Sequence, residues 1–461
     1  MSALTALRIR ALSRAVHGPV LRPGQDGYAR EVAGFNLATT HTPDIIVGAT
    51  RAADVVAAVS WAAASATPVA VQATGHGANL AVDHGLLIST ARMTGVEIDP
   101  NTRTATVGAG ARWRHVLDAA APHGLAALNG SSSDVGVVGY TVGGGLPVLG
   151  RAFGYAAEWV RSFQVVTAEG TLREVDATHE PELFWALRGG KGNVGIVTSL
   201  VCELLPLRRI YGGGLYYPGE HAADLLRAYA AWVRTLPDNL CTAFTLLRLP
   251  PFPDVPEPLR GRFVARVAVA YPGDPSRGAR LIAPMRAAAP LLIDTVTEMD
   301  YLDVDRIYQD PEHPLPVREG CTLLRDLTPA VVETLLDEAG PDAPCPLLMV
   351  EIRHLSGRLS QAPTVEDAIC ARDASFLVET VGILAGPHAQ AVPAATAGLH
   401  AALAPYSTGR TMVNLHGTPG DDTDRARAWT PEVHTRLRRV KAGYDPANLI
   451  RFGHAVTPAM A

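Results

Sequence analysis

Several residues and motifs that mark common protein classes are scarce in this sequence of 461 residues. Lysine is nearly absent: Lys191 and Lys441 are the only two among 40 lysines and arginines, which we attribute to codon usage in a GC-rich genome. With no long basic run and a net charge of −5, the chain is not expected to bind nucleic acid. The longest alanine- and valine-rich stretch, residues 55–73, is interrupted by Trp61 and Pro68 and is too polar to span a membrane.

Cysteines and metal-binding motifs are equally sparse. The five cysteines are widely scattered, and their odd number and the lack of a Cys-x-x-Cys pair argue against a disulfide framework and a zinc site. No His-Glu-x-x-His or other close spacing of ligands occurs, so we expect no metal centre. The first 18 residues carry arginines and no continuous apolar core, unlike a signal peptide. We therefore expect a cytoplasmic protein, either a monomer or a homodimer.

The sequence does contain enough apolar residues for large cores. Hydrophobic residues make up 48% and charged residues 18%, which favours a folded α/β or α+β protein. Two extended runs at 163–175, joined by a Glu-Gly turn, predict a β-hairpin. From about 210 to 400, long strand candidates alternate with helices, which predicts an open sheet covered on one face. The last 55 residues contain an extended run at 411–417 and a helix at 431–444.

The first of three glycine-rich segments is Gln-Ala-Thr-Gly-His-Gly-Ala at residues 72–78, directly after a predicted strand. Small residues allow backbone N–H groups to approach a diphosphate closely, and His76 would then lie at a bound cofactor. The alternative, which these residues alone leave open, is an ordinary histidine in a tight turn.

The other two segments are residues 129–145 and 188–197. The former has six glycines in seventeen positions, a density that costs conformational entropy and usually marks backbone pressed against a ligand. The latter connects a helix to a strand but lacks the Gly-Lys-Ser/Thr ending of a nucleoside triphosphate loop. A partial dinucleotide fingerprint at 107–113 is not convincing either, because Trp113 occupies the third glycine position.

In this order, the segments TGHGA, VGVVGYTVGGG, ELFWALRGGKGNVGIVT and YDPANLIRFGH resemble the vanillyl-alcohol oxidase superfamily. More specifically, they are similar to the bacterial berberine-bridge-enzyme-like, FAD-linked oxidases. The resemblance implies an α+β fold, with a two-part FAD-binding domain and a substrate domain whose antiparallel sheet is covered by helices. The expected boundaries are 1–206 for the FAD-binding domain, 207–405 for the substrate domain and 406–461 for a C-terminal segment that returns to the FAD-binding domain.

The resemblance also implies how FAD is bound. His76 would form a single covalent link to the flavin 8α-methyl carbon, because Ser132 occupies the position from which many relatives form a second link through cysteine. Val135 would lie beside the oxygen-reactive flavin carbon, where valine accompanies oxidases in this family. The other cofactor-binding residues implied are Gln72, Ala73, Thr74, Gly75, Gly77, Ala78, Gly136, Gly139, Tyr140, Thr141, Gly144, Gly145, Gly195, Ile196, Val197, Asn414 and Phe452.

The catalytic residues depart from the family pattern. Sugar and alcohol oxidases of the family carry a tyrosine base and an aromatic residue where this chain has Met412 and Leu415. This difference favours a substrate that gives up hydride easily, such as a hydroquinone, an amine or an activated biosynthetic intermediate. Strand alternation places Glu351 and Arg353 on one face, which either looks onto the flavin or carries an exposed ion pair. The catalytic candidates are Glu351, Arg353, Asn414, Tyr140 and His416, the last as a base.

The function predicted from the sequence is therefore a covalent FAD-dependent oxidase of a small secondary metabolite. A hydride would pass to flavin N5, and O₂ would reoxidise the flavin to give H₂O₂. Two alternatives remain. One is a flavoprotein that catalyses oxidative cyclisation or redox-neutral chemistry, and the other is a drug-binding or resistance protein on the same scaffold.

Overall fold

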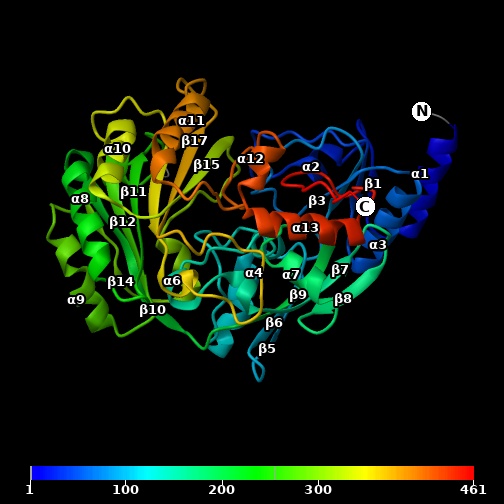
Figure 1. Cartoon of the computed structure of the whole chain (residues 1–461), viewed down its shortest axis with the longest axis horizontal. Coiled ribbons are helices and arrows are strands. Elements are labelled where there is room, and N and C mark those ends of the chain that lie inside the picture. Colours follow the sequence, from blue (N-terminus) through cyan, green and yellow to red (C-terminus); the bar gives the residue numbers. More distant parts are fainter. Residues whose placement is uncertain (1–2, 254, 461) are drawn as a thin grey trace.

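The computed structural model describes residues 3–253 and 255–460, and it is built around three β-sheets (Figure 1). The first sheet consists, in spatial order, of β1 (Val20–Leu21), β2 (Ile45–Gly48), β4 (Leu86–Ser89) and β3 (Val69–Gln72). The last three strands are parallel, and every residue of β2 and β4 is buried, as expected for parallel strands covered on both faces. The short helix α2 (Tyr28–Val32) lies next to β2.

The second sheet is antiparallel and has five strands. They are, in spatial order, β5 (Val96–Asp99), β6 (Thr104–Gly108), β9 (Ile196–Glu203), β7 (Val160–Val166) and β8 (Leu172–Asp176). The predicted hairpin is confirmed as β7 and β8. Because β6 is antiparallel to both its neighbours, the Gly-x-Gly after it does not belong to a Rossmann βαβ unit. Helices α4 (Trp113–Ala120) and α7 (Pro181–Leu187) pack on this sheet.

Helix α3 (Ala52–Ala64) joins the first two sheets into one core. Val55 and Ala58 of α3 share a hydrophobic cluster with residues of β2 and β4, and with Val166 and Ile196 from the second sheet. Helix α1 (Ala3–Ala15) packs against α3 at the edge of the molecule (Figure 1). The glycine-rich segments thus emerge from a rigid two-sheet scaffold.

The third sheet has eight antiparallel strands, and helices cover one of its faces, as predicted (Figure 1). Its main order is β13-β10-β12-β11-β16-β17-β15, and β14 also pairs with β10. The strands are β10 (Arg209–Pro218), β11 (Cys241–Arg248), β12 (Phe263–Tyr271), β13 (Ile293–Asp294), β14 (Thr297–Asp300), β15 (Val317–Leu324), β16 (Met349–His354) and β17 (Phe376–Ile383). The covering helices are α8 (Ala222–Trp232), α9 (Pro275–Arg286), α10 (Pro329–Ala339) and α11 (Val392–Leu403). The opposite face turns toward the N-terminal sheets.

The C-terminal segment packs back against the N-terminal part. Helix α12 (Asp422–Ala426) is short, and α13 (Pro431–Tyr444) packs on α7 with the bounds that the sequence predicts. Beyond α13, Leu449 accepts a 2.9 Å hydrogen bond from the backbone N–H of Val69 in β3. The prediction of an extended run at 411–417 is wrong, because Leu415 N–H bonds Met412 O at 2.9 Å and closes a turn there.

The α+β fold is thus confirmed, while the domain boundaries at 206 and 405 stay predictions. Within residues 3–253 and 255–460, no group of three or more His, Cys, Asp and Glu residues is placed to hold a metal ion, and the five cysteines are free. No helix in the same part of the chain is long and apolar enough to cross a bilayer.

Candidate active site

The loop after β3 is packed tightly around a glycine. Gly75 has a φ of +73°, and a Cβ there would lie 2.5 Å from the Cα of Gly34, so only glycine fits. Gln72, at the end of β3, is buried, and its Oε1 lies 2.9 Å from His41 Nε2 in a hydrogen bond. Its Nε2 also donates to Ala33 O at 3.2 Å. The side chain of Gln72, a predicted cofactor contact, therefore serves to order the loop.

His76 is half-buried in this loop, with its ring stacked on Phe35 at a centroid distance of 4.0 Å. Its Nδ1 shares a 2.9 Å hydrogen bond with Thr74 Oγ1, and its Nε2 makes none within the described residues. Burial, reinforced by the charge of Arg112, lowers the pKa of His76 to about 4. The imidazole is therefore neutral at pH 7 and has a lone pair available for bonding.

The second glycine-rich segment lies next to the histidine loop. A Cβ on Gly136 would touch Thr74 Oγ1 at 3.4 Å, and the segment then forms the short helix α5 (Val137–Thr141). No heavy atom lies within 4 Å of a Cβ built on Gly139, and the same holds for Gly77 in the histidine loop. Gly77, in the histidine loop, and Gly139, in α5, thus have open space in front of their backbone, as a flat ligand would need.

Ser132 and Val135, the predicted flavin neighbours, are both partly exposed in the same segment. Ser132 Oγ accepts a 3.2 Å hydrogen bond from the backbone N–H of Asp134. The carboxylate of Asp134 lies 3.1 Å from Arg112, the cation that acts on His76. The structure therefore brings Ser132, Val135 and His76 into one region of the surface.

The third glycine-rich segment and the C-terminal turn meet at Asn414. Its Nδ2 donates to Tyr140 O at 2.8 Å, and its Oδ1 accepts from Lys191 Nζ. A Cβ on Gly143 would lie 2.0 Å from Asn414 Oδ1, so glycine is required for this contact. Asn414 thus connects the second and third glycine-rich segments, and its place beside the flavin stays a prediction.

Four other predicted cofactor contacts are less favourably placed. Ile196 and Val197 are 1% and 6% exposed in hydrophobic cores, and Gly195 is packed directly against β7. Only the backbone of these three residues is left to meet a nucleotide. Phe452 packs against the face of the first sheet opposite α3, with its ring 5.3 Å from that of His84. The structure therefore does not group Phe452 with Asn414.

The inner face of the third sheet carries a buried polar row. Glu351 is 1% exposed and is bonded to Arg353 at 2.5 Å, to Arg266 at 3.2 Å and to Thr245 Oγ1 at 3.2 Å. Burial alone would raise the pKa of Glu351, but the two guanidinium groups outweigh it and hold the pKa below its usual value. The exposed-ion-pair interpretation is therefore wrong. Because the lone pairs of Glu351 are engaged, it orients Arg353 rather than acting as a base.

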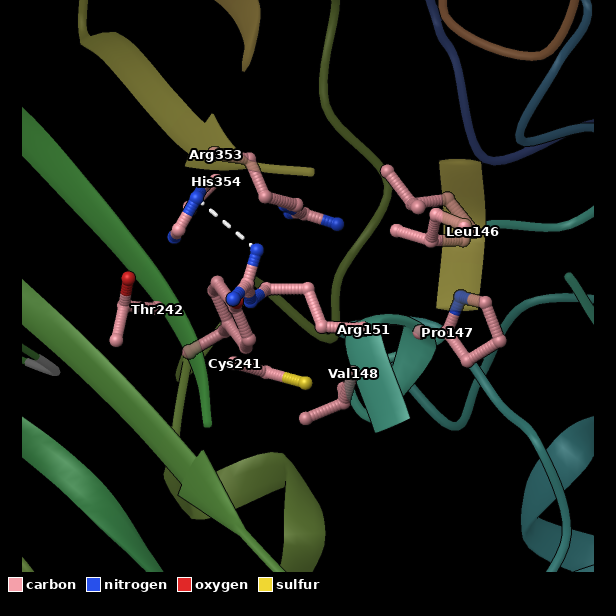
Figure 2. A pocket seen from close by; sticks show the side chains of 11 residues that line it. Leu146, Pro147, Val148, Arg151, Cys241, Thr242, Arg353 and His354 are labelled. Carbon is pink, nitrogen blue, oxygen red and sulfur yellow. Dashed lines mark hydrogen bonds between the residues drawn. The ribbon is translucent and has the colours of Figure 1, made fainter. Parts of the chain in front are cut away.

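Arg353 extends from this row toward the glycine-rich segments. Its guanidinium lies 4.9 Å from the ring centroid of Tyr308, and Figure 2 shows the side chain directed toward Leu146, next to Gly145. Behind it, His354 and Arg151 are joined by a 3.0 Å hydrogen bond, drawn as a dashed line in Figure 2. The cavity between them measures about 10 Å³, room for one water, so it is not the substrate pocket.

Glu379, on β17, is a further candidate that the sequence does not single out. It pairs directly opposite Glu351, so both lie on the inner face of the sheet. Its side chain is nearly buried and makes no hydrogen bond within the described residues. Burial raises the pKa of Glu379 to about 8, with Arg353 opposing the shift and the charges of Glu351 and Glu319 adding to it. The only signal in the sequence is one acid in the apolar strand ASFLVETVGIL.

Tyr140 belongs to the second glycine-rich segment and lies near Arg353, on the inner face of the third sheet. Its ring contacts Trp113 edge-on at 5.5 Å, and a Cβ on Gly145 would lie 2.4 Å from it. Its hydroxyl is buried without a hydrogen-bond partner, and burial raises its pKa well above the usual value, with Arg353 opposing. His416, the other candidate, lies 3.1 Å from Asp424 through its Nε2, while its Nδ1 is buried without a hydrogen-bond partner, so its role as a base stays a prediction.

These residues fit a flavin. Gly77 and Gly139 have open space at their backbone, His76 is neutral, and the buried hydroxyl of Tyr140 has no partner among the described residues. The unpaired hydroxyl is the kind of buried polar atom that a bound group satisfies.

Comparison with known proteins supports this assignment. Residues 43–176 match the family described as an FAD binding domain. An FAD-linked oxidoreductase of Dictyostelium discoideum is 24% identical over 98% of this chain and 97% of its own. The fold is similar to that of 6-hydroxy-D-nicotine oxidase from Arthrobacter nicotinovorans, with a TM-score of 0.83 and 23% identity over 96% of this chain and 98% of the other. It is also similar to that of xylooligosaccharide oxidase from Myceliophthora thermophila, with a TM-score of 0.85 and 21% identity over 98% of this chain and 100% of the other. The BBE-like 1 protein of Physcomitrella patens gives 0.83 at 17% identity, covering 98% and 100%.

The matched residues show an FAD binding domain, and the fold is of the vanillyl-alcohol oxidase type. The resemblance to the berberine-bridge-enzyme-like, FAD-linked proteins is confirmed, and the chain is an FAD-dependent oxidoreductase.

Proposed function

We propose that the protein is an oxidase that carries FAD covalently on His76 and transfers hydride from a small organic metabolite to flavin N5, with O₂ as the final acceptor. The observation that carries the proposal is His76 itself. Its pKa of about 4 makes it a neutral nucleophile, and stacking on Phe35 and the bond to Thr74 fix its orientation. A histidine in a glycine-rich loop with a lone pair available has the chemistry that a bond to the flavin 8α carbon needs.

Bound FAD would supply the two-electron acceptor, and the protein would position the substrate and take its proton. Ser132 has only a hydroxyl, so we propose a single link. We further propose that Val135 leaves room for O₂ beside the ring and that Asn414 holds the ring from the C-terminal side.

On the substrate side, we propose that Arg353 binds the substrate and that Glu379 accepts its proton. Arg353 is held by Glu351, so its guanidinium is fixed before the substrate arrives. Two carboxyl groups on this face have pKa values near the working pH of an enzyme, Glu319 at about 7 and Glu379 at about 8, and we assign the base to Glu379 because Glu319 interacts with Lys191. Glu379 thus joins the five residues that the sequence proposes as catalytic, and we prefer it to His416 as the base.

The substrate class follows from the missing tyrosine. Met412 is 5% exposed and packs in a hydrophobic cluster, so no phenol is available at that position to deprotonate an alcohol. We therefore propose a substrate that loses hydride readily, such as an amine, a hydroquinone or an activated biosynthetic intermediate. One solved relative is named an oxidase of a nicotine derivative and another an oxidase of a sugar oligomer, so the shared fold does not identify the substrate class.

The test of this proposal has two parts. Acid precipitation should leave the yellow colour in the pellet for the wild type and in the supernatant for His76→Ala, and the intact mass should show one bound FAD. Candidate metabolites that bleach the flavin anaerobically should then yield one H₂O₂ per turnover in air. Freely soluble wild-type flavin contradicts the covalent link, a mass with two links contradicts the role of Ser132, and turnover without peroxide contradicts the oxidase.

A further inference from the structure

Lys191 is an unusual residue for its glycine-rich segment. It is one of two lysines in the chain, stands within the run Arg-Gly-Gly-Lys-Gly-Asn and has a φ of +62°, a conformation that glycine adopts far more readily. The other lysine, Lys441, is fully buried and bonded to Asp445 and to the carbonyls of Asn193 and Ile450, so its role is structural. A strained non-glycine residue at a ligand site points to a role for its side chain.

The ammonium group of Lys191 lies where the candidate flavin contacts converge. Its Nζ donates to Gly139 O at 3.1 Å and to the side-chain oxygen of Asn414. The carboxyl group of Glu319, on β15 of the third sheet, raises the pKa of Lys191. The charge of Lys191 in turn lowers the pKa of His454, in the C-terminal segment. Three segments of the FAD-binding part and one strand of the substrate sheet thus surround a single amine.

The backbone that carries Lys191 is fixed from behind. Arg188 donates to the carbonyls of Ala157 at 2.8 Å and Glu366 at 3.1 Å, and Trp429 Nε1 donates to Gly189 O at 3.0 Å. The N–H of Lys191 itself bonds a carbonyl of the second glycine-rich segment. The position of the amine is therefore set by the fold and does not depend on a flexible loop.

We propose that Lys191 supplies the positive charge that stabilises the reduced flavin, a role that rests on the proposed binding of FAD at this site. A hydride brings two electrons and one proton, so the ring gains one negative charge unless a second proton follows. An ammonium group at the Asn414 side of the ring offsets that charge. Burial lowers the pKa of Lys191 to about 8, with Glu319 opposing, so the amine is mostly protonated at pH 7.

We place the amine at the ring rather than at the diphosphate because of its partners. Glu319 belongs to the substrate sheet, which faces the ring plane, and Asn414 is the proposed ring contact. Glu319 also forms a side-chain hydrogen bond with Asn79, just beyond the histidine loop, so the pair lies between that loop and the sheet.

The experiment measures the flavin and needs neither substrate nor oxygen. Sulfite adds to oxidised flavin and leaves a negatively charged ring, so its dissociation constant reports on nearby charge. We expect Lys191→Gly and Lys191→Met to weaken sulfite binding at least tenfold and to lower the two-electron midpoint potential by about 30 mV or more, the equivalent of tenfold. Lys191→Gly should fold normally because glycine relaxes the backbone at this φ.

Two controls sharpen the result. Lys191→Arg keeps the charge and should stay within about threefold of wild type for sulfite, while Arg161→Met removes an exposed charge on β7 and should change nothing. A sulfite dissociation constant within twofold of wild type and a midpoint potential within about 9 mV of it, the equivalent of twofold, in Lys191→Gly would overturn the proposal. So would an unchanged potential in Lys191→Gly together with a lower FAD content in the His76→Ala, Lys191→Gly double variant than in His76→Ala, which would assign the amine to the diphosphate. The covalent link and the oxygen reaction are scored separately, so their failure contradicts the proposed function and leaves this measurement intact.

Discussion

Glu379→Gln tests the assignment of the catalytic base most directly, because glutamine keeps the shape of the side chain and cannot accept a proton. With a pKa of about 8, about one-tenth of Glu379 is ionised at pH 7 and about nine-tenths at pH 9. The wild-type rate of flavin reduction should therefore rise about tenfold over this range. In the variant the rate should be flat with pH and lower by ~10²–10⁴-fold at pH 9, the usual contribution of a positioned base.

The assay is anaerobic stopped-flow absorbance of the flavin, with a substrate found by bleaching. Glu333→Gln, on the exposed side of α10, is the matched control and should behave as wild type. A flat wild-type profile from pH 6 to 9, or a variant within about threefold of wild type at pH 9, would refute the reasoning. The substrate would then ionise without help from the protein.

The same variant has a stability signature that does not depend on substrate. The folded-state pKa of Glu379 is raised from 4.5 to about 8, so between these values the folded protein holds a proton that the unfolded chain has lost. This contribution to stability is present below about pH 4.5 and is lost as the pH rises toward 8. Glu379→Gln carries no such charge. The melting temperature of the variant minus that of wild type, measured by circular dichroism, should therefore increase as the pH is raised from 5 to 9.

Three further predictions concern the surroundings of the flavin. Val135→Leu should slow reoxidation of the reduced flavin in air, followed by absorbance, and an unchanged rate would remove Val135 from the oxygen site. Gly75→Ala should cost about 1–3 kcal/mol in urea unfolding, because alanine is strained at a φ of +73° and collides with Gly34, whereas Gly77→Ala, which has open space, should cost far less. Arg353→Met should destabilise the protein by about 3–5 kcal/mol by leaving a buried carboxylate short of a partner, and a loss below 1 kcal/mol would contradict the buried ion pair.

The sequence predicts best the elements whose signals are local. Helix α13 has Thr430 as N-cap, with its side chain accepting from Val433 N–H, and Pro431 in the first turn, so both its start and its periodicity are visible in the sequence. The turn at Gly170, with a φ of +82°, likewise marks the β7–β8 hairpin. The predicted strand at 411–417 fails because Asn414 is tied to Tyr140 and Lys191, contacts from distant segments that override the β-propensity of its neighbours.

The candidate site likewise contains residues that local sequence patterns predict and residues that only tertiary contacts place. Its proposed cofactor half consists of glycine-rich segments whose spacing can be read from the sequence, and a resemblance to known loops is enough to propose His76. Its substrate half depends on strand register: Glu379 faces Glu351 only because β16 and β17 pair as they do, and no local pattern distinguishes it from a solvent-exposed acid. The same register that buries Glu379 raises its pKa, and the same packing that holds Arg188 fixes Lys191. The groups that would tune the chemistry are therefore those whose properties arise from tertiary contacts, and the substrate is best sought through them rather than through the loops proposed to bind FAD.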